Sequence, residues 1–94
     1  MIPQLFWRKQ LSESESIYSI CSIPNKSEII ASCANEIIFL KVKSGEIYER
    51  RRAHQSQIYS IRMSFDGSYF ASSSSDGTVV IWRSFNNDGF VTYG

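Results

Sequence analysis

The sequence predicts an all-β fold built from two four-stranded antiparallel sheets, and two observations carry the prediction. Asp66-Gly67 and Asp76-Gly77 each separate two apolar runs. This is a strong local signal for a β-hairpin, because glycine accepts a positive φ and aspartate tolerates it. The tetrapeptide Ile17-Tyr18-Ser19-Ile20 recurs 41 residues later as Ile58-Tyr59-Ser60-Ile61. A spacing of about 40–45 residues is expected for repeated four-stranded units.

Length and composition limit the chain to one small domain. Its 94 residues are 43% hydrophobic and 20% charged, with a net charge of +1, which is an ordinary globular composition. This charge gives no reason to expect a nucleic-acid partner. No apolar run approaches the roughly 18 residues that span a bilayer, and residues 1–11 are too polar for a secretory signal. We therefore expect no nucleic-acid partner and no direct membrane insertion.

The cysteines and the histidine predict neither a disulfide framework nor a metal site. Cys21 and Cys33 are too few for the dense bridging of a small secreted domain, so we expect reduced structural thiols and a cytoplasmic or otherwise reducing compartment. The single histidine, His54, lacks the closely spaced ligand pairs of a zinc site. The sequence predicts no cofactor.

The N-terminal region is predicted to form a short strand followed by a loop. Residues 3–11 contain the apolar cluster Leu5-Phe6-Trp7, which favours a strand. An aromatic anchor for a protein partner is the alternative. Residues 12–16 read Ser-Glu-Ser-Glu-Ser and are expected to form a solvated linker rather than a phosphorylation site.

The first repeat is expected over residues 17–52 and is the weaker of the two. Ile30-Ala31-Ser32 aligns with Phe70-Ala71-Ser72 after a one-residue gap, and Leu40 stands at the position of Trp82. No Asp-Gly pair marks its second turn. Apolar packing alone must hold this copy together.

Three consecutive arginines, Arg50-Arg51-Arg52, end the first repeat. Nucleic-acid and nuclear-import sites usually need basic runs of about five to eight residues. The arginines also follow two glutamates, Glu46 and Glu49. We therefore predict a charged outer strand that resists pairing with another sheet.

The second repeat, residues 54–93, carries four polar residues that a plain meander does not need. His54, Ser72, Asp76 and Trp82 can form a directional chain, in which indole donates to hydroxyl, hydroxyl to imidazole and imidazole to carboxylate. Such a chain would provide partners for a serine hydroxyl on an apolar strand face, which costs roughly 1–3 kcal/mol if left unpaired. The turn residues predicted for this repeat are Asp66, Gly67, Gly77, Asp88 and Gly89.

The serine, histidine and aspartate of this chain also have the composition of a hydrolytic triad. Ser72, however, lies inside a β run rather than on an exposed elbow, and no oxyanion-hole loop accompanies it. Trp82 offers the hydroxyl a competing partner. We therefore predict a structural role and no enzymatic activity.

These residues give the second repeat a resemblance to the WD repeat of β-propellers. That pattern has a histidine before the first strand, an Asp-Gly turn, an Ala-Ser strand, a second Asp-Gly turn and a strand ending in tryptophan. It is met here by His54, both turns, Ala71-Ser72 and Trp82, whereas Ala53 and Arg83 depart from the usual glycine and aspartate. The resemblance implies part of a β-propeller, with residues 3–11 completing the last blade of the ring.

The order of an N-terminal Phe-Trp-Arg-Lys stretch, a degenerate blade and a strong blade is similar to the start of the large WD-repeat subunits of intraflagellar transport complex A. Those subunits are scaffolds in retrograde ciliary transport. The similarity implies a non-enzymatic protein-interaction scaffold at the cilium or basal body, with other subunits of a large complex as partners. A WD-repeat adaptor in ubiquitin ligation, RNA processing or signalling is the alternative.

Two blades leave two apolar faces uncovered, because a propeller needs four to eight blades. At about 25 cal/mol per Å², exposing several hundred Å² on each face forfeits on the order of 10 kcal/mol. The initial Met1 and the end at a repeat boundary, Gly94, favour an N-terminal part of a larger propeller. A short chain that self-assembles into a ring is the alternative.

Overall fold

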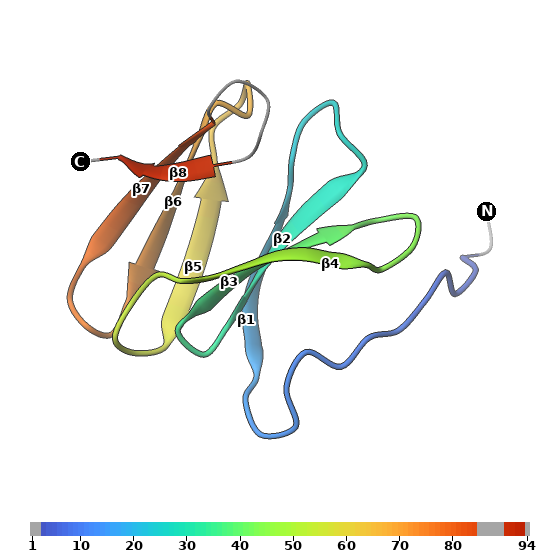
Figure 1. The fold of residues 1–94 in the computed structure, drawn as a ribbon, viewed down its shortest axis with the longest axis horizontal. Coiled ribbons are helices and arrows are strands. Elements are labelled where there is room, and N and C mark those ends of the chain that lie inside the picture. Colours follow the sequence, from blue (N-terminus) through green and yellow to red (C-terminus); the bar gives the residue numbers. More distant parts are fainter. Residues whose placement is uncertain (1–2, 85–89, 94) are drawn as a thin grey trace.

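The computed structural model describes residues 3–84 and 90–93. These residues form two four-stranded antiparallel sheets, each with its strands in sequence order (Figure 1). The first sheet, blade one, contains β1 (Ile17–Ser22), β2 (Glu28–Cys33), β3 (Glu36–Lys41) and β4 (Ile47–Arg52). The second sheet, blade two, contains β5 (Ile58–Met63), β6 (Tyr69–Ser74), β7 (Val79–Ser84) and β8 (Phe90–Tyr93). The predicted all-β fold of two four-stranded antiparallel sheets is therefore confirmed.

The two blades pack face to face, with β1 and β5 side by side at the centre of the molecule (Figure 1). One apolar core lies between the sheets. Its aromatic centre is the edge-to-face contact between Phe39 of blade one and Phe70 of blade two, whose ring centroids are 6.2 Å apart. The other buried members of this core are Ile23, Ile30, Ile37, Ile58, Ile61 and Trp82.

Both blades use the same strand register. Ile20 pairs with Ala31 in blade one, and 41 residues later Ile61 pairs with Ser72 in blade two. Each innermost strand also has its irregularity at the same place, around Tyr18 in β1 and Tyr59 in β5. The rings of these two tyrosines meet edge to face at 5.8 Å.

This register corrects the alignment expected from the sequence. Ala31, not Ser32, stands at the position of Ser72, so the first two strands need no gap. The extra residue of blade two lies instead in the turn between its second and third strands. Leu40 does stand at the position of Trp82, because Leu40 pairs with Ile29 as Trp82 pairs with Phe70. The motif Ala-Ser occurs in both copies, which made the shifted alignment the more obvious one.

The expected strand over residues 3–11 is absent from the structure, which assigns no strand between Pro3 and Ser16. A strand needs a second strand for its hydrogen bonds, and the blade that the resemblance makes its partner is not among the described residues. The segment lies instead against the far face of blade one. The Trp7 indole N–H donates to the Val42 carbonyl, and Trp7 and Leu11 pack on a cluster of Ala31, Cys33, Ile38 and Leu40.

The arginine-rich strand β4 forms the outer edge of blade one (Figure 1). Arg50 makes an ion pair with Glu36 of the neighbouring strand at 3.1 Å, and Arg51 pairs with Glu49. All four side chains are at least one-third exposed. Such surface pairs contribute at most about 1 kcal/mol each, so the strand is a charged edge rather than a source of stability.

Both cysteines are free thiols. Cys33 is buried on the face covered by the N-terminal segment, whereas Cys21 is half-buried beside the core between the blades. Burial raises the pKa of the Cys21 thiol to about 11 and also raises the pKa of Cys33. Both are therefore neutral and unreactive at neutral pH. The described residues include no helix that is long and apolar enough to cross a membrane.

Candidate functional site

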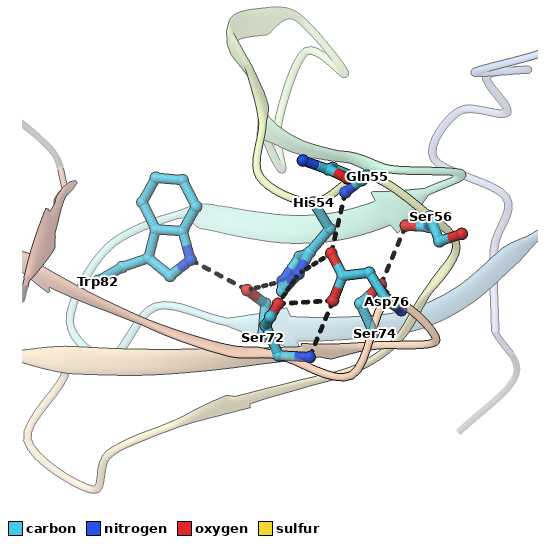
Figure 2. A network of polar contacts seen from close by, with 8 residues as sticks. His54, Gln55, Ser56, Ser72, Ser74, Asp76 and Trp82 are labelled. Atoms are coloured by element: carbon cyan, nitrogen blue, oxygen red, sulfur yellow. Dashed lines mark hydrogen bonds and ion pairs between the residues drawn. The ribbon is translucent and has the colours of Figure 1, made fainter.

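The structure brings the four polar residues of blade two together in the order expected from the sequence (Figure 2). The indole Nε1 of Trp82 donates to Ser72 Oγ at 3.1 Å. The same Oγ lies 2.8 Å from His54 Nε2. On the other side of the imidazole, His54 Nδ1 lies 3.2 Å from Asp76 Oδ2. The chain of contacts thus connects the loop before β5 with β6, β7 and the turn between them.

The neighbours of the imidazole determine which nitrogen carries its proton. The Trp82 indole can only donate, and an ionised Asp76 can only accept. His54 Nδ1–H therefore donates to the carboxylate, Nε2 accepts from the Ser72 hydroxyl, and the hydroxyl oxygen accepts from the indole. This single arrangement satisfies each polar atom of the four side chains, and no buried side-chain nitrogen or oxygen among the described residues lacks a partner.

Thr78 is a fifth member of this group that the sequence prediction missed. Its hydroxyl donates to Asp76 Oδ1 at 2.5 Å, its backbone N–H donates to the same oxygen at 2.9 Å, and its Oγ1 lies 3.0 Å from His54 Nδ1. An aspartate that binds the N–H two residues later is a recurrent turn motif. The sequence Asp-Gly-Thr therefore held a signal for this contact.

The carboxylate of Asp76 is held in its ionised form. Its pKa lies well below the usual carboxyl range, chiefly because the Thr78 hydroxyl and then the Gln55 backbone N–H donate to it. The Gln55 N–H reaches Asp76 Oδ2 at 2.9 Å. Each donor stabilises the charged form of the carboxylate. The bond from Gln55 also attaches the loop before β5 to the turn that contains Asp76.

A second contact connects the same loop and turn. Ser74 Oγ donates to the Ser56 carbonyl at 3.1 Å and accepts the Asp76 backbone N–H at 3.0 Å (Figure 2). No role is predicted for Ser74 from the sequence alone. Its role was missed because it depends on a backbone carbonyl that is 18 residues away.

The predicted turn residues also lie in turns where the structure describes them. Gly67 has φ 78° and donates to the Ser64 carbonyl at 3.0 Å, and Gly77 has φ 85° and donates to the Ser74 carbonyl at 3.2 Å. The hydroxyl and N–H of Ser68 are the main causes that lower the pKa of Asp66 to about 2. Asp88 and Gly89, predicted for the last turn, lie outside the described residues.

The geometry of this site is unsuited to nucleophilic chemistry. Ser72 is completely buried inside β6, and His54 and Trp82 are 5% and 2% exposed. The Trp82 ring stacks on Phe70 at 5.4 Å with an interplanar angle of 5°, and its indole N–H donates to the Ser72 hydroxyl oxygen. A hollow of about 420 Å³ reaches Arg52, Gln55 and Asp76 on the outside, but Ser72 is not part of its wall. The wall of this hollow also includes His54 and Thr78, whose hydroxyl donates to Asp76, and a molecule in it would not reach the Ser72 hydroxyl.

Comparison with known protein families identifies one that matches most of the chain. A family model described as "Vps42 beta-propeller" matches residues 8–93. This range covers both blades and most of the N-terminal segment.

Several individual proteins are similar to the chain. It is 29% identical over 79 residues to a protein of Xenopus tropicalis named "Intraflagellar transport protein 122 homolog", and 26% identical over 89 residues to the Mus musculus protein of that name. These matches cover 84% and 95% of this chain but only 7% of each relative. The chain is also 36% identical over 76 residues to "Uncharacterized WD repeat-containing protein L84" of Acanthamoeba polyphaga mimivirus, covering 78% of this chain and 58% of that protein.

Proposed function

The chain belongs to the Vps42 beta-propeller family, and we propose that it acts as a non-enzymatic scaffold that binds other proteins through the surfaces of its blades. Two observations together carry the proposal. The family match covers both blades, and the polar residues of blade two are buried and hydrogen-bond one another. Fold alone does not name a function. The burial of the Ser72 hydroxyl supports a non-enzymatic role, because a nucleophile must be within reach of its substrate.

We further propose that the assembly is intraflagellar transport complex A and that the chain acts at the cilium or basal body. This is supported by the similarity to proteins named "Intraflagellar transport protein 122 homolog" from two vertebrates. The chain spans 7% of the length of these relatives. It therefore corresponds to a small part of such a protein, and its partners are other proteins of the complex or further blades.

The experiment is to express the tagged chain in a ciliated cell and to ask which complex it joins. We expect co-sedimentation with complex A subunits and a tag signal at the cilium base. A matched variant, Phe70→Asp, places a charge in the core between the blades and should abolish the association, because the blade surfaces then no longer form. Recovery of the folded chain in a different assembly, with none in complex A, would refute the ciliary proposal.

A WD-repeat adaptor in another assembly is the second candidate. It is favoured by the 36% identity to the mimivirus WD repeat-containing protein, of which the chain covers a larger share than of the ciliary relatives. The same co-sedimentation experiment separates the two candidates, since only the first expects complex A subunits.

A further inference from the structure

The three consecutive arginines at the end of β4 do not have equivalent surroundings. Arg50 makes an ion pair with Glu36, and Arg51 makes one with Glu49. Arg52 is exposed, and no carboxylate among the described residues lies within ion-pair distance of it. It stands opposite Glu36 in the sheet, but that glutamate already holds Arg50. The third arginine is therefore a cation without a counter-charge in this part of the chain.

Arg52 contributes to the wall of the hollow of about 420 Å³ that lies beside the polar residues of blade two. The rest of the wall comes from the loop before β5 and from the turn between β6 and β7, where Gln55 and Asp76 lie next to each other (Figure 2). This volume falls in the range of about 300–1,000 Å³ that is usual for ligand sites. The hollow is built from residues of the two blades and the loop that joins them, so no further blade is needed to form it.

The carboxylate in this wall has no acceptor position left for a ligand. Asp76 Oδ1 accepts the hydroxyl and the backbone N–H of Thr78, at 2.5 and 2.9 Å. Asp76 Oδ2 accepts the backbone N–H of Gln55 at 2.9 Å and the Nδ1–H of His54 at 3.2 Å. A carboxylate has about four acceptor sites, and these four donors fill them. A lysine or arginine of a partner would therefore find no hydrogen bond at Asp76.

The hydrogen-bonding groups that the wall leaves free suit a ligand that accepts. A guanidinium has only N–H donors, and the one on Arg52 has no hydrogen-bond partner among the described residues. Gln55 is exposed, and its side-chain amide, which has no partner in the same part of the chain, adds N–H donors. Arginine can bind a carboxylate through two parallel N–H···O bonds. A carboxylate therefore matches both the charge and the donors of this wall.

We propose that this hollow binds the carboxylate side chain of an aspartate or glutamate of a partner protein, with Arg52 as its ion-pair partner and the Gln55 amide as a second donor. This rests on the proposed scaffold function in that the ligand belongs to a protein. A phosphate group fits less well, because it carries up to about two negative charges at neutral pH. Arg52 balances one of them, whereas the other would face the carboxylate of Asp76 in the same wall.

The test titrates the complete chain with short peptides near neutral pH and follows its proton–nitrogen NMR signals. The tripeptide Gly-Glu-Gly, capped at both ends, supplies one side-chain carboxylate, and capped Gly-Gln-Gly is its neutral counterpart. A capped phosphoserine tripeptide supplies a phosphate, and Gly-Gly-Gly with a free C-terminus supplies a carboxylate at a chain end. We expect Gly-Glu-Gly to shift the Arg52 Nε–H and Gln55 side-chain amide signals to saturation. Each of the other three peptides should bind more weakly, Gly-Gln-Gly at least about tenfold, because it lacks the charge-assisted bonds.

Matched variants assign the binding to the third arginine. Arg52→Gln should weaken binding of Gly-Glu-Gly at least about tenfold, because the ion pair is lost. Arg52→Lys keeps the charge but not the planar pair of donors, so it should weaken binding several-fold. Arg62→Gln removes an exposed arginine that is not part of this wall and should leave the affinity unchanged.

Several outcomes would overturn the proposal. Equal binding of Gly-Glu-Gly and Gly-Gln-Gly would show that the carboxylate is not recognised, and equal losses in Arg52→Gln and Arg62→Gln would show that the hollow is not the site. Tighter binding of the phosphoserine peptide, or of Gly-Gly-Gly with its free C-terminus, would replace the side-chain carboxylate by a phosphate or a chain end. None of these results bears on the co-sedimentation experiment, so the scaffold proposal is tested separately.

Discussion

Blade one and blade two share one strand register, yet different contacts hold each of them together. In blade two a buried imidazole connects a serine hydroxyl on β6 with a carboxylate in the following turn. In blade one the equivalent of that serine is Ala31, and the position of Trp82 is taken by Leu40, both in an aliphatic cluster. The alternating strands therefore suffice for a blade, and the polar group is an additional fastening.

The two blades also differ in how the segment that precedes each sheet is attached. Blade two attaches its entering loop by Asp76, which accepts the Gln55 N–H. Blade one has the tryptophan of its N-terminal segment attached to the Val42 carbonyl and packed over its face. Blade one thus has one face covered by the N-terminal segment, whereas the entering loop of blade two is attached to a turn of the same blade.

The largest expected effect tests whether the position of Phe70 contributes more stability than the equivalent position of blade one. Phe70→Ala removes a ring that is 1% exposed and contacts both Phe39 and Trp82. We expect the free energy of unfolding to fall by about 3–5 kcal/mol, or the chain to lose its fold, because the cavity lies between the blades. Ile29→Ala, at the same register position in blade one, is only half-buried and should cost below about 2 kcal/mol. Urea unfolding that gave equal losses would contradict the comparison.

The next effect tests the polar fastening. His54→Ala leaves the Ser72 hydroxyl without its acceptor and Asp76 without one donor, so we expect a loss of roughly 1–3 kcal/mol in urea unfolding. The control is Glu13→Ala, since Glu13 lies 41 residues before His54 and is exposed, and its change should stay within about 0.5 kcal/mol. Ester hydrolysis should be at background in both. A measurable rate that His54→Ala removes without unfolding the chain would point to catalysis.

The sequence allowed the two-sheet fold and the four residues of the polar chain to be predicted because those signals are local. Asp-Gly turns and a 41-residue repeat are readable without tertiary information. The contacts of Ser74 with a distant carbonyl, and of Trp7 with Val42, depend on segments brought together only by folding. The strand expected at residues 3–11 failed for the same reason, since a strand's identity depends on the partner edge available to it.

Low pH should weaken the turns of blade two more than those of blade one, because the turns of blade one carry asparagine where blade two has aspartate. Asp66 and Asp76 have lowered pKa values in the folded state, with hydrogen bonds from Ser68 and Thr78 as the main causes. Their stabilisation is complete above the ordinary carboxyl pKa of 3.8 and is lost as the pH falls, for Asp66 towards its folded value of about 2.

The double variant Asp66→Asn with Asp76→Asn should therefore show a flatter loss of stability between pH 4 and pH 2 than the parent chain. The measurement is the urea midpoint at a series of pH values. Glu13→Gln serves as a control that keeps the parent's profile. An unchanged profile in the double variant would place the acid-sensitive groups elsewhere in the chain.

The smallest effect concerns the turn where the two blades differ by one residue. Gly77 has φ 85° and Ala34 has φ 54°, so an alanine in blade one adopts a conformation suited to glycine. Gly77→Ala should cost about 1 kcal/mol from backbone strain alone, because a Cβ there would meet no atom within 4 Å. Ala34→Gly should instead raise stability by about 0.5 kcal/mol, since relief of the left-handed strain exceeds the entropy that glycine loses on folding. Ala53→Gly, at ordinary φ, should lower stability; if both alanine-to-glycine changes lowered it, the strain in blade one would be smaller than the entropy of its turn.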